Sequence, residues 1–169
     1  IQAAQDKDEK LALIESQLSD ACQIICDIYS RFLFESSVFE ARPQEFLDAD
    51  RLCQLMLEAQ KKAYGDGLDQ TCLHPYMWLC KGHYYSGSLS FYNFPYAFGG
   101  LFARGLYAKY QQEGEKFVPL YKEMLHATSV NDVEDTAKIA GIDLTDKAFW
   151  RQDLQSLADE IDLFCDLVK

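Results

Sequence analysis

The sequence predicts an all-α fold, and three observations lead to this expectation. Apolar residues recur every three or four positions along several long stretches, as they do on one face of a helix. No segment alternates polar and apolar residues over the length of a strand. Glycine and proline interrupt the periodic stretches where helices would end. With 169 residues, of which 49% are hydrophobic, the chain can build a real core, and we expect a single all-α region over residues 1–169.

The first predicted helix is also the longest. Helical spacing of apolar residues continues through residues 9–41, a stretch that contains neither glycine nor proline. The helix should end near Arg42, because a residue that precedes proline avoids the α conformation. Between Ile24 and Phe34 the apolar residues spread beyond one stripe, so more than one side of this segment should be covered.

The later helices are predicted from their capping residues. Asp48 should cap a helix over 49–64, and Gly65 should end it in a left-handed conformation. Its inward-facing positions should be Leu52, Leu55, Met56 and Ala59. Ser129 and Asp132 resemble a weak capping box. Four further helices are expected, over residues from about 90–93 to 113, 115–127, 131–140, and from 145 or 146 to the end of the chain.

Residues 68–90 should form an irregular connection, because the His74-Pro75 pair breaks a helix. Several aromatic residues in this connection are expected to pack down on the helices. The helix that follows is rich in small residues between Ala97 and Gly105. Small residues should let another backbone approach this helix closely.

Composition and charge exclude several classes of function. The formal net charge of −11 argues against nucleic acid as a partner, since an acidic chain repels phosphate. No apolar run approaches the ~18 residues of a membrane span. The start of the chain lacks the features of a signal peptide, so we expect a cytoplasmic protein. The first residue is Ile1 rather than Met, which suggests a piece of a longer polypeptide.

The chain has six cysteines, and none of them forms a C-x-x-C pair. Cys22 and Cys26 lie four apart on the first predicted helix, with no pair of histidines nearby to complete a zinc site. The pattern favours free, buried thiols in a reducing compartment, with a zinc site on this pair as the weaker alternative.

The stretch from His83 to Tyr110 holds six of the ten tyrosines and one of the three histidines. A phenol or an imidazole N–H that points at a developing oxyanion stabilises it in a water-poor cleft. Tyr92 and Tyr96 are four apart and would share a face if both lay in the first turn of a helix. The alternative is half-buried core residues with satisfied hydroxyls. The sequence has no self-sufficient catalytic motif, neither H-E-x-x-H nor G-x-S-x-G nor a phosphate loop.

Four stretches of the sequence are more specific than helical periodicity. They are DIYSRFLFESSVFEAR (27–42), LMLEAQKKAYGDGLD (55–69), LHPYMWLCKGHYYSGSLSFYNFPYAFGGLFARGLYAKYQQEG (73–114) and GIDLTDKAFWRQDLQSLADEIDLF (141–164). The phrases HPYMW and FYNFPYAFG, in this order and spacing, carry most of the specificity. Together the four stretches cover nearly the whole chain and resemble the C-terminal part of oligoendopeptidase F, a bacterial zinc metallopeptidase related to thimet oligopeptidase.

This resemblance implies a helical lobe of a two-lobed clamshell with a deep channel. It also implies a zinc ion held by the two histidines of H-E-x-x-H and by a glutamate on the next helix. The glutamate inside the motif is the general base that activates the water on the metal. None of these residues is in the chain, which is the main departure from the family pattern. We therefore expect the zinc-binding segment to lie upstream and the isolated chain to bind no zinc and to be inactive.

The resemblance also assigns residues of this chain to the substrate side of the site. Related enzymes use a histidine and tyrosines to bind the substrate backbone and to stabilise the tetrahedral intermediate. His83 matches that histidine and Tyr92 matches a tyrosine at the start of the helix, while Tyr96 is a less direct match across Pro95.

Two more residues are candidates for substrate binding. Tyr85 is one of them, and His74 is the other, although a structural or supporting role suits His74 better. Nothing in the sequence suggests a functional role for His126. The expected partners are an oligopeptide substrate and the N-terminal remainder of the same polypeptide, with self-association of the fragment possible through its half of the channel. The alternative function is a non-enzymatic helical interaction domain with an aromatic docking patch.

Overall fold

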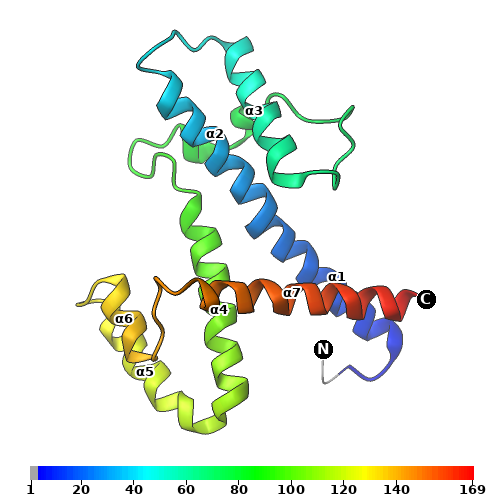
Figure 1. Cartoon of the computed structure of the whole chain (residues 1–169), viewed down its shortest axis with the longest axis vertical. Coiled ribbons are helices and arrows are strands. Elements are labelled where there is room, and N and C mark those ends of the chain that lie inside the picture. The colour runs from blue at the N-terminus through cyan, green and yellow to red at the C-terminus, as the bar shows by residue number, and fades with distance from the viewer. Residues whose placement is uncertain (1–3) are drawn as a thin grey trace. The chain divides into compact units, whose positions relative to one another are not determined.

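The computed structural model describes residues 4–169, and every regular element in this range is helical, which confirms the all-α prediction (Figure 1). The α-helices are α1 (Lys7–Cys22), α2 (Ile28–Ala41), α3 (Ala49–Tyr64), α4 (Phe94–Glu113), α5 (Phe117–Ala127), α6 (Val133–Ile139) and α7 (Lys147–Val168). Shorter helical turns are the π-helical η1 (Gln23–Asp27) and the 3-10 turns η2 (Met77–Cys80), η3 (Gly82–Tyr84) and η4 (Gly114–Lys116). Within the described range, no helix combines the length and the apolar character needed to cross a membrane.

The chain divides into two compact units, and each is built from helices. The first unit contains the residues up to Leu18 together with Gly99–Lys169. The second unit is the continuous segment Ser19–Phe98, which carries the candidate site.

The first predicted helix is present, but it contains a feature that its periodicity did not reveal. The helical backbone runs from Lys7 to Ala41 and ends near Arg42 as expected. The predicted reason is wrong, because Arg42 keeps an α conformation with φ −56° and ψ −35°; the helix ends where Pro43 has no N–H to continue the hydrogen bonding. The π-helical turn η1 interrupts it at Gln23–Asp27. Such turns widen an α-helix locally and are frequent at functional sites. Spacing of apolar residues cannot distinguish one wide turn from regular α-helix.

Most of the predicted helix ends are confirmed. The Asp48 carboxylate accepts a hydrogen bond from the Arg51 N–H at 2.8 Å and so caps α3. Gly65 ends α3 with a φ of 56°, a left-handed value that a residue with a Cβ rarely adopts. The last helix begins after Asp146, whose side chain accepts from the Ala148 N–H.

The predicted capping box before α6 is wrong. Asp132 alone caps this helix, by accepting from the Asp135 N–H at 3.0 Å. The Ser129 hydroxyl instead donates to the His126 carbonyl at the end of α5, at 3.2 Å. Ser129 therefore belongs to the preceding helix end, because its hydroxyl satisfies a carbonyl that α5 leaves free.

The core of the second unit lies between α2 and α3, which pack side by side (Figure 1). Its buried apolar residues are Phe34, Leu55, Met56 and Ala59. Trp78 and Tyr84 of the connection pack against this core, as expected for an aromatic-rich loop. The positions predicted to face inward on α3 are therefore confirmed, and the connection is held down where the candidate site begins.

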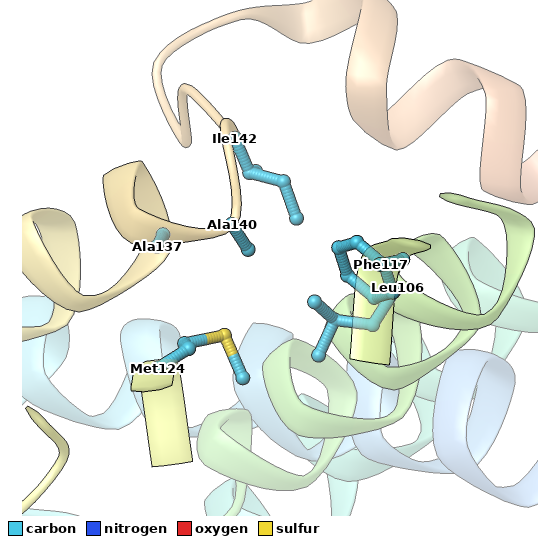
Figure 2. Close-up of a cluster of buried hydrophobic side chains, with 6 residues drawn as sticks. All are labelled: Leu106, Phe117, Met124, Ala137, Ala140 and Ile142. Carbon is cyan, nitrogen blue, oxygen red and sulfur yellow. The ribbon is translucent and has the colours of Figure 1, made fainter. Parts of the chain in front are cut away.

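The core of the first unit contains a cluster of apolar residues from α4, α5, α6 and the turn after α6 (Figure 2). Its buried residues are Leu106, Phe117, Met124, Ala137, Ala140 and Ile142. At Gly105 a Cβ would lie 2.2 Å from the Phe149 Cζ atom. The small residue thus makes room for an aromatic side chain rather than for another backbone, which corrects our expectation at this position.

One buried carboxyl lies beside this apolar core. Asp153 is 2% exposed, and among the described residues its Oδ2 atom has no hydrogen-bond partner. Burial raises the pKa of Asp153 to about 6, although the positive charge of Arg104 acts in the opposite direction. Arg104 itself pairs with Glu160, with 2.7 Å between Nη2 and Oε1.

Candidate functional site

Three of the predicted site residues lie together in the second unit. The His83 Nε2 atom is 3.2 Å from the Tyr96 hydroxyl, within hydrogen-bond distance. The two rings meet edge to face, with 5.6 Å between their centroids. Tyr92 also meets Tyr96 edge to face, with 5.7 Å between the ring centroids. We call His83, Tyr92 and Tyr96 the His-Tyr cluster.

Local structure explains how these residues come together. His83 lies in η3, Tyr92 precedes α4, and Tyr96 is in the first turn of α4. The loop between η3 and α4 is closed by a hydrogen bond from the Phe91 N–H to the His83 carbonyl, at 2.9 Å. Phe91 has a φ of 57°, which is unusual for a residue with a bulky side chain. Such a conformation persists only where the surrounding contacts hold it.

The cluster presents its polar atoms to solvent. The side chain of Tyr92 is 41% exposed and that of Tyr96 is 45% exposed. If the His83 Nε2 carries the proton, it donates to the Tyr96 oxygen and leaves the phenol proton of Tyr96 free for an outside acceptor. A chain of this kind polarises the phenol and strengthens it as a donor. The geometry therefore gives Tyr96 a direct link to His83, although the sequence match favoured Tyr92.

The other candidates have different neighbours. The Tyr85 hydroxyl donates to the Trp78 carbonyl at 3.3 Å. The pKa of Tyr85 is raised, mainly by burial and to a smaller extent by the nearby Cys80. At His74 it is the backbone that is held, because the Gln60 side chain accepts from its N–H and donates to its carbonyl, at 3.1 and 2.8 Å. This double hydrogen bond fastens the connection to α3. His126 is exposed in the last turn of α5.

Behind the His-Tyr cluster lies a group of buried polar residues that the sequence analysis missed. The side chain of Asn93 is fully buried and has a partner at both ends. Its Oδ1 accepts from the Arg31 Nη1 at 3.0 Å, and its Nδ2 donates to a Glu35 carboxylate oxygen. Arg31 also forms an ion pair with Asp27 in the π-helical turn. We call Arg31, Glu35 and Asn93 the Asn93 clamp.

A sequence signal for the clamp did exist. Asp27, Arg31 and Glu35 are spaced four apart, which places them on one face of a helix. Asp27 and Arg31 lie in the apolar segment that we expected to be covered, and Glu35 directly follows it. Charged residues on a covered face must be paired, because an unpaired buried charge is costly. Their partner Asn93 is far away in sequence and carries no comparable signal.

Burial changes the acidity of groups around the clamp. Glu35 is 5% exposed, and burial raises its pKa to about 7. The hydrogen bond from Asn93 and the charge of Arg31 act in the opposite direction and are the smaller effects. The pKa of Tyr84 is raised, first by burial and then by the negative charge of Glu35. Within the described residues, the Tyr84 hydroxyl has no hydrogen-bond partner.

The six cysteines are free thiols, but the expectation that they are buried is wrong. Cys22, Cys72, Cys80 and Cys165 are exposed, and the other two are half-buried. These thiols lie on helix faces and in the connection rather than in either apolar core. Burial, and then the neighbouring Cys22, raises the pKa of Cys26. Among the described residues, no three His, Cys, Asp or Glu side chains gather as they would around a metal ion.

Known proteins offer no identification. Comparisons with protein-family models, with curated proteins and with solved structures find no match to this chain. The grounds for assigning a function are therefore the chemistry of the His-Tyr cluster and the resemblance of the sequence.

Proposed function

We propose that the chain is part of a zinc-dependent metalloendopeptidase that hydrolyses short oligopeptides, in the manner of oligoendopeptidase F. In this proposal the chain belongs to one helical lobe of a clamshell. The observation that carries it is the His-Tyr cluster, in which an imidazole and two phenols from separate elements lie together with exposed polar atoms. These residues are the ones that the resemblance assigns to the substrate.

The cluster suits the stabilisation of an oxyanion. Attack on a peptide carbonyl moves negative charge onto its oxygen, and neutral donors already in place lower the energy of that state. Tyr96, supported by His83, and Tyr92 can each supply an O–H to such an oxygen. Removal of one donor of this kind typically costs on the order of 3 kcal/mol of transition-state stabilisation.

The metal is not assigned to residues of this chain. The described residues offer no cluster of metal ligands, and the sequence has no H-E-x-x-H. In the proposal, zinc and the general base belong to another segment of the polypeptide. The chain supplies binding and charge stabilisation, and by itself is expected to bind no stoichiometric zinc and to show no peptidase activity. Metal analysis that finds one tightly held zinc per chain would contradict this assignment.

Substitution of Tyr92 tests the proposed role in the full-length polypeptide. Tyr92→Phe should lower kcat by about 100-fold, because it removes one donor to the oxyanion while it keeps the ring. KM and zinc content should change little. Tyr107→Phe is a matched control, since Tyr107 is an exposed tyrosine of α4 outside the cluster, and it should retain full activity. An unchanged kcat for Tyr92→Phe would remove Tyr92 from the mechanism.

The alternative, a non-enzymatic domain that docks a partner, has one observation in its favour. The second unit exposes many large apolar side chains, among them Phe39, Phe46, Tyr85 and Phe94. The coding sequence upstream distinguishes the two functions. An H-E-x-x-H motif ahead of Ile1 supports the peptidase, and a start codon just before Ile1 without the motif supports the docking domain.

A further inference from the structure

At both ends of the loop between η3 and α4, neighbouring residues face different surroundings. Tyr92 is exposed, whereas its neighbour Asn93 is fully buried. The same alternation occurs at the other end of the loop, where Tyr84 packs against Phe34 and the adjacent His83 reaches Tyr96. His83 and Tyr92 thus each have a neighbour in the chain that is held on the core side.

Asn93 connects these two sides through its backbone. Its carbonyl accepts from the Tyr96 N–H at 3.1 Å, and its N–H donates to the Phe91 carbonyl at 3.0 Å. Phe91 in turn donates to the His83 carbonyl. The backbone around Asn93 therefore links all parts of the cluster, and the side chain of Asn93 is the group that fastens this backbone to α2.

We propose that the Asn93 clamp is a positioning device, in which Arg31 and Glu35 of α2 hold Asn93 and thereby fix the His83–Tyr96 pair. An amide fits this role because it offers one acceptor and one donor that point apart. Arg31 uses the acceptor and Glu35 uses the donor, so rotation of the amide would break both hydrogen bonds. Arg31 is itself held by Asp27, whose carboxylate also lies 3.9 Å from the Lys81 Nζ.

The aromatic contacts behind the loop act in the same direction. The Phe91 ring packs against both Phe39 and Tyr84, with centroid distances of 4.8 and 5.7 Å. These contacts hold the unusual backbone at Phe91, but apolar contacts fix the orientation of a side chain less strictly than hydrogen bonds do. The clamp adds directional hydrogen bonds, and the one from the charged Arg31 guanidinium is of the stronger kind. The catalytic meaning of this positioning rests on the proposed function, whereas the positioning itself does not.

NMR of the 169-residue chain tests the positioning without any need for activity. Glu35→Leu removes the acceptor of the Asn93 amide, and Glu35→Gln keeps an acceptor oxygen at the same place. We expect Glu35→Leu to lose the nuclear Overhauser contact between the His83 imidazole and the Tyr96 ring, and Glu35→Gln to retain it. A folded Glu35→Leu variant with the contact intact would overturn the proposal.

A second measurement on the unmodified chain covers the case in which Glu35→Leu does not fold. Urea below the unfolding transition should remove the slowly exchanging side-chain amide signal of Asn93 and the His83–Tyr96 contact together. Persistence of that contact after the Asn93 signal has gone would also overturn the proposal.

Kinetic measurements on Glu35→Leu separate this inference from the proposed function. In the full-length polypeptide, Glu35→Leu should lower kcat by about 10- to 100-fold with little change in KM, because displaced catalytic groups cost rate rather than binding. If the NMR contact is lost and kcat stays the same, the positioning is supported and the peptidase function is contradicted. If the contact is unaffected, the positioning is wrong whatever the activity.

Discussion

The two units of this protein are stabilised in different ways. The core of the first unit is apolar, and the buried carboxyl of Asp153 beside it keeps an oxygen without a partner. The second unit has an apolar core as well, but it also buries Arg31, Glu35 and Asn93, which are hydrogen-bonded to one another. Apolar contacts are not directional, whereas hydrogen bonds fix orientation. The unit with the directional network is the one that carries the candidate site.

Loss of one partner should be most damaging in the paired network. Arg31→Met should lower the free energy of unfolding by about 3 kcal/mol, because the buried Asn93 Oδ1 would lose its donor and Asp27 would keep only the more distant Lys81 as a cation. In the first unit, Ile142→Val should cost only about 1 kcal/mol, the usual effect of one buried methyl group. Urea unfolding monitored by circular dichroism measures both.

The matched control for Arg31→Met is the same substitution at the surface. Arg51 pairs with Glu45 at 3.0 Å, and their side chains are 35% and 42% exposed, far more than those of Arg31 and Asp27. Arg51→Met should therefore change stability by less than about 1 kcal/mol. An equal loss for Arg31→Met and Arg51→Met would show that the buried network contributes no more than a surface ion pair.

The pH dependence of stability should differ between the two buried carboxyls. The pKa of Glu35 is about 7 in the folded chain, against an ordinary value of 4.5. Between these values the folded state keeps a proton that the unfolded state has lost, so stability should fall as pH rises through this window. Glu35→Gln should remove the decline and raise stability at pH 8 by on the order of 2 kcal/mol.

Asp153 provides the corresponding test in the first unit. The pKa of Asp153 is about 6, against an ordinary value of 3.8, so the fall in stability that it causes should occur at lower pH than the fall caused by Glu35. Asp153→Asn should therefore change the pH dependence of the free energy of unfolding below about pH 6 and leave it unchanged between pH 6 and 7. Urea unfolding at a series of pH values checks both variants. If the stability of Glu35→Gln fell above pH 6 as much as that of the unmodified chain, Glu35 would not be the cause of the pH dependence.

Gly105 tests the packing between α4 and α7 in the first unit. Gly105→Ala adds a Cβ that would lie 2.2 Å from the Phe149 ring, so the ring must move. Overpacking of this kind costs about 1–3 kcal/mol, of which the better helix propensity of alanine offsets up to about 1 kcal/mol. The control is Gly99→Ala, where the new methyl group meets no atom within 4 Å and should stabilise α4. Thermal unfolding that ranks the two variants in the opposite order would show that Phe149 adapts at no cost.

The sequence by itself determined the helical fold, most helix ends and the inward face of α3. These features depend on contacts between residues a few positions apart, which spacing and capping chemistry describe well. The sequence also pointed to the segment that holds His83, Tyr92 and Tyr96. It missed the π-helical turn, and it assigned to Ser129 a cap that Asp132 provides alone, because neither depends on the apolar pattern.

Only the tertiary structure decided which polar groups meet. Arg31 and Asn93 are 62 residues apart, Glu35 and Asn93 are 58 apart, and no local pattern connects them. The tertiary structure also paired His83 with Tyr96, which lie 13 positions apart in the sequence. The physical reason is that a hydrogen bond needs two groups within about 3 Å in the correct orientation. Packing of distant segments sets that distance, whereas periodicity only sets which side of a helix a residue occupies.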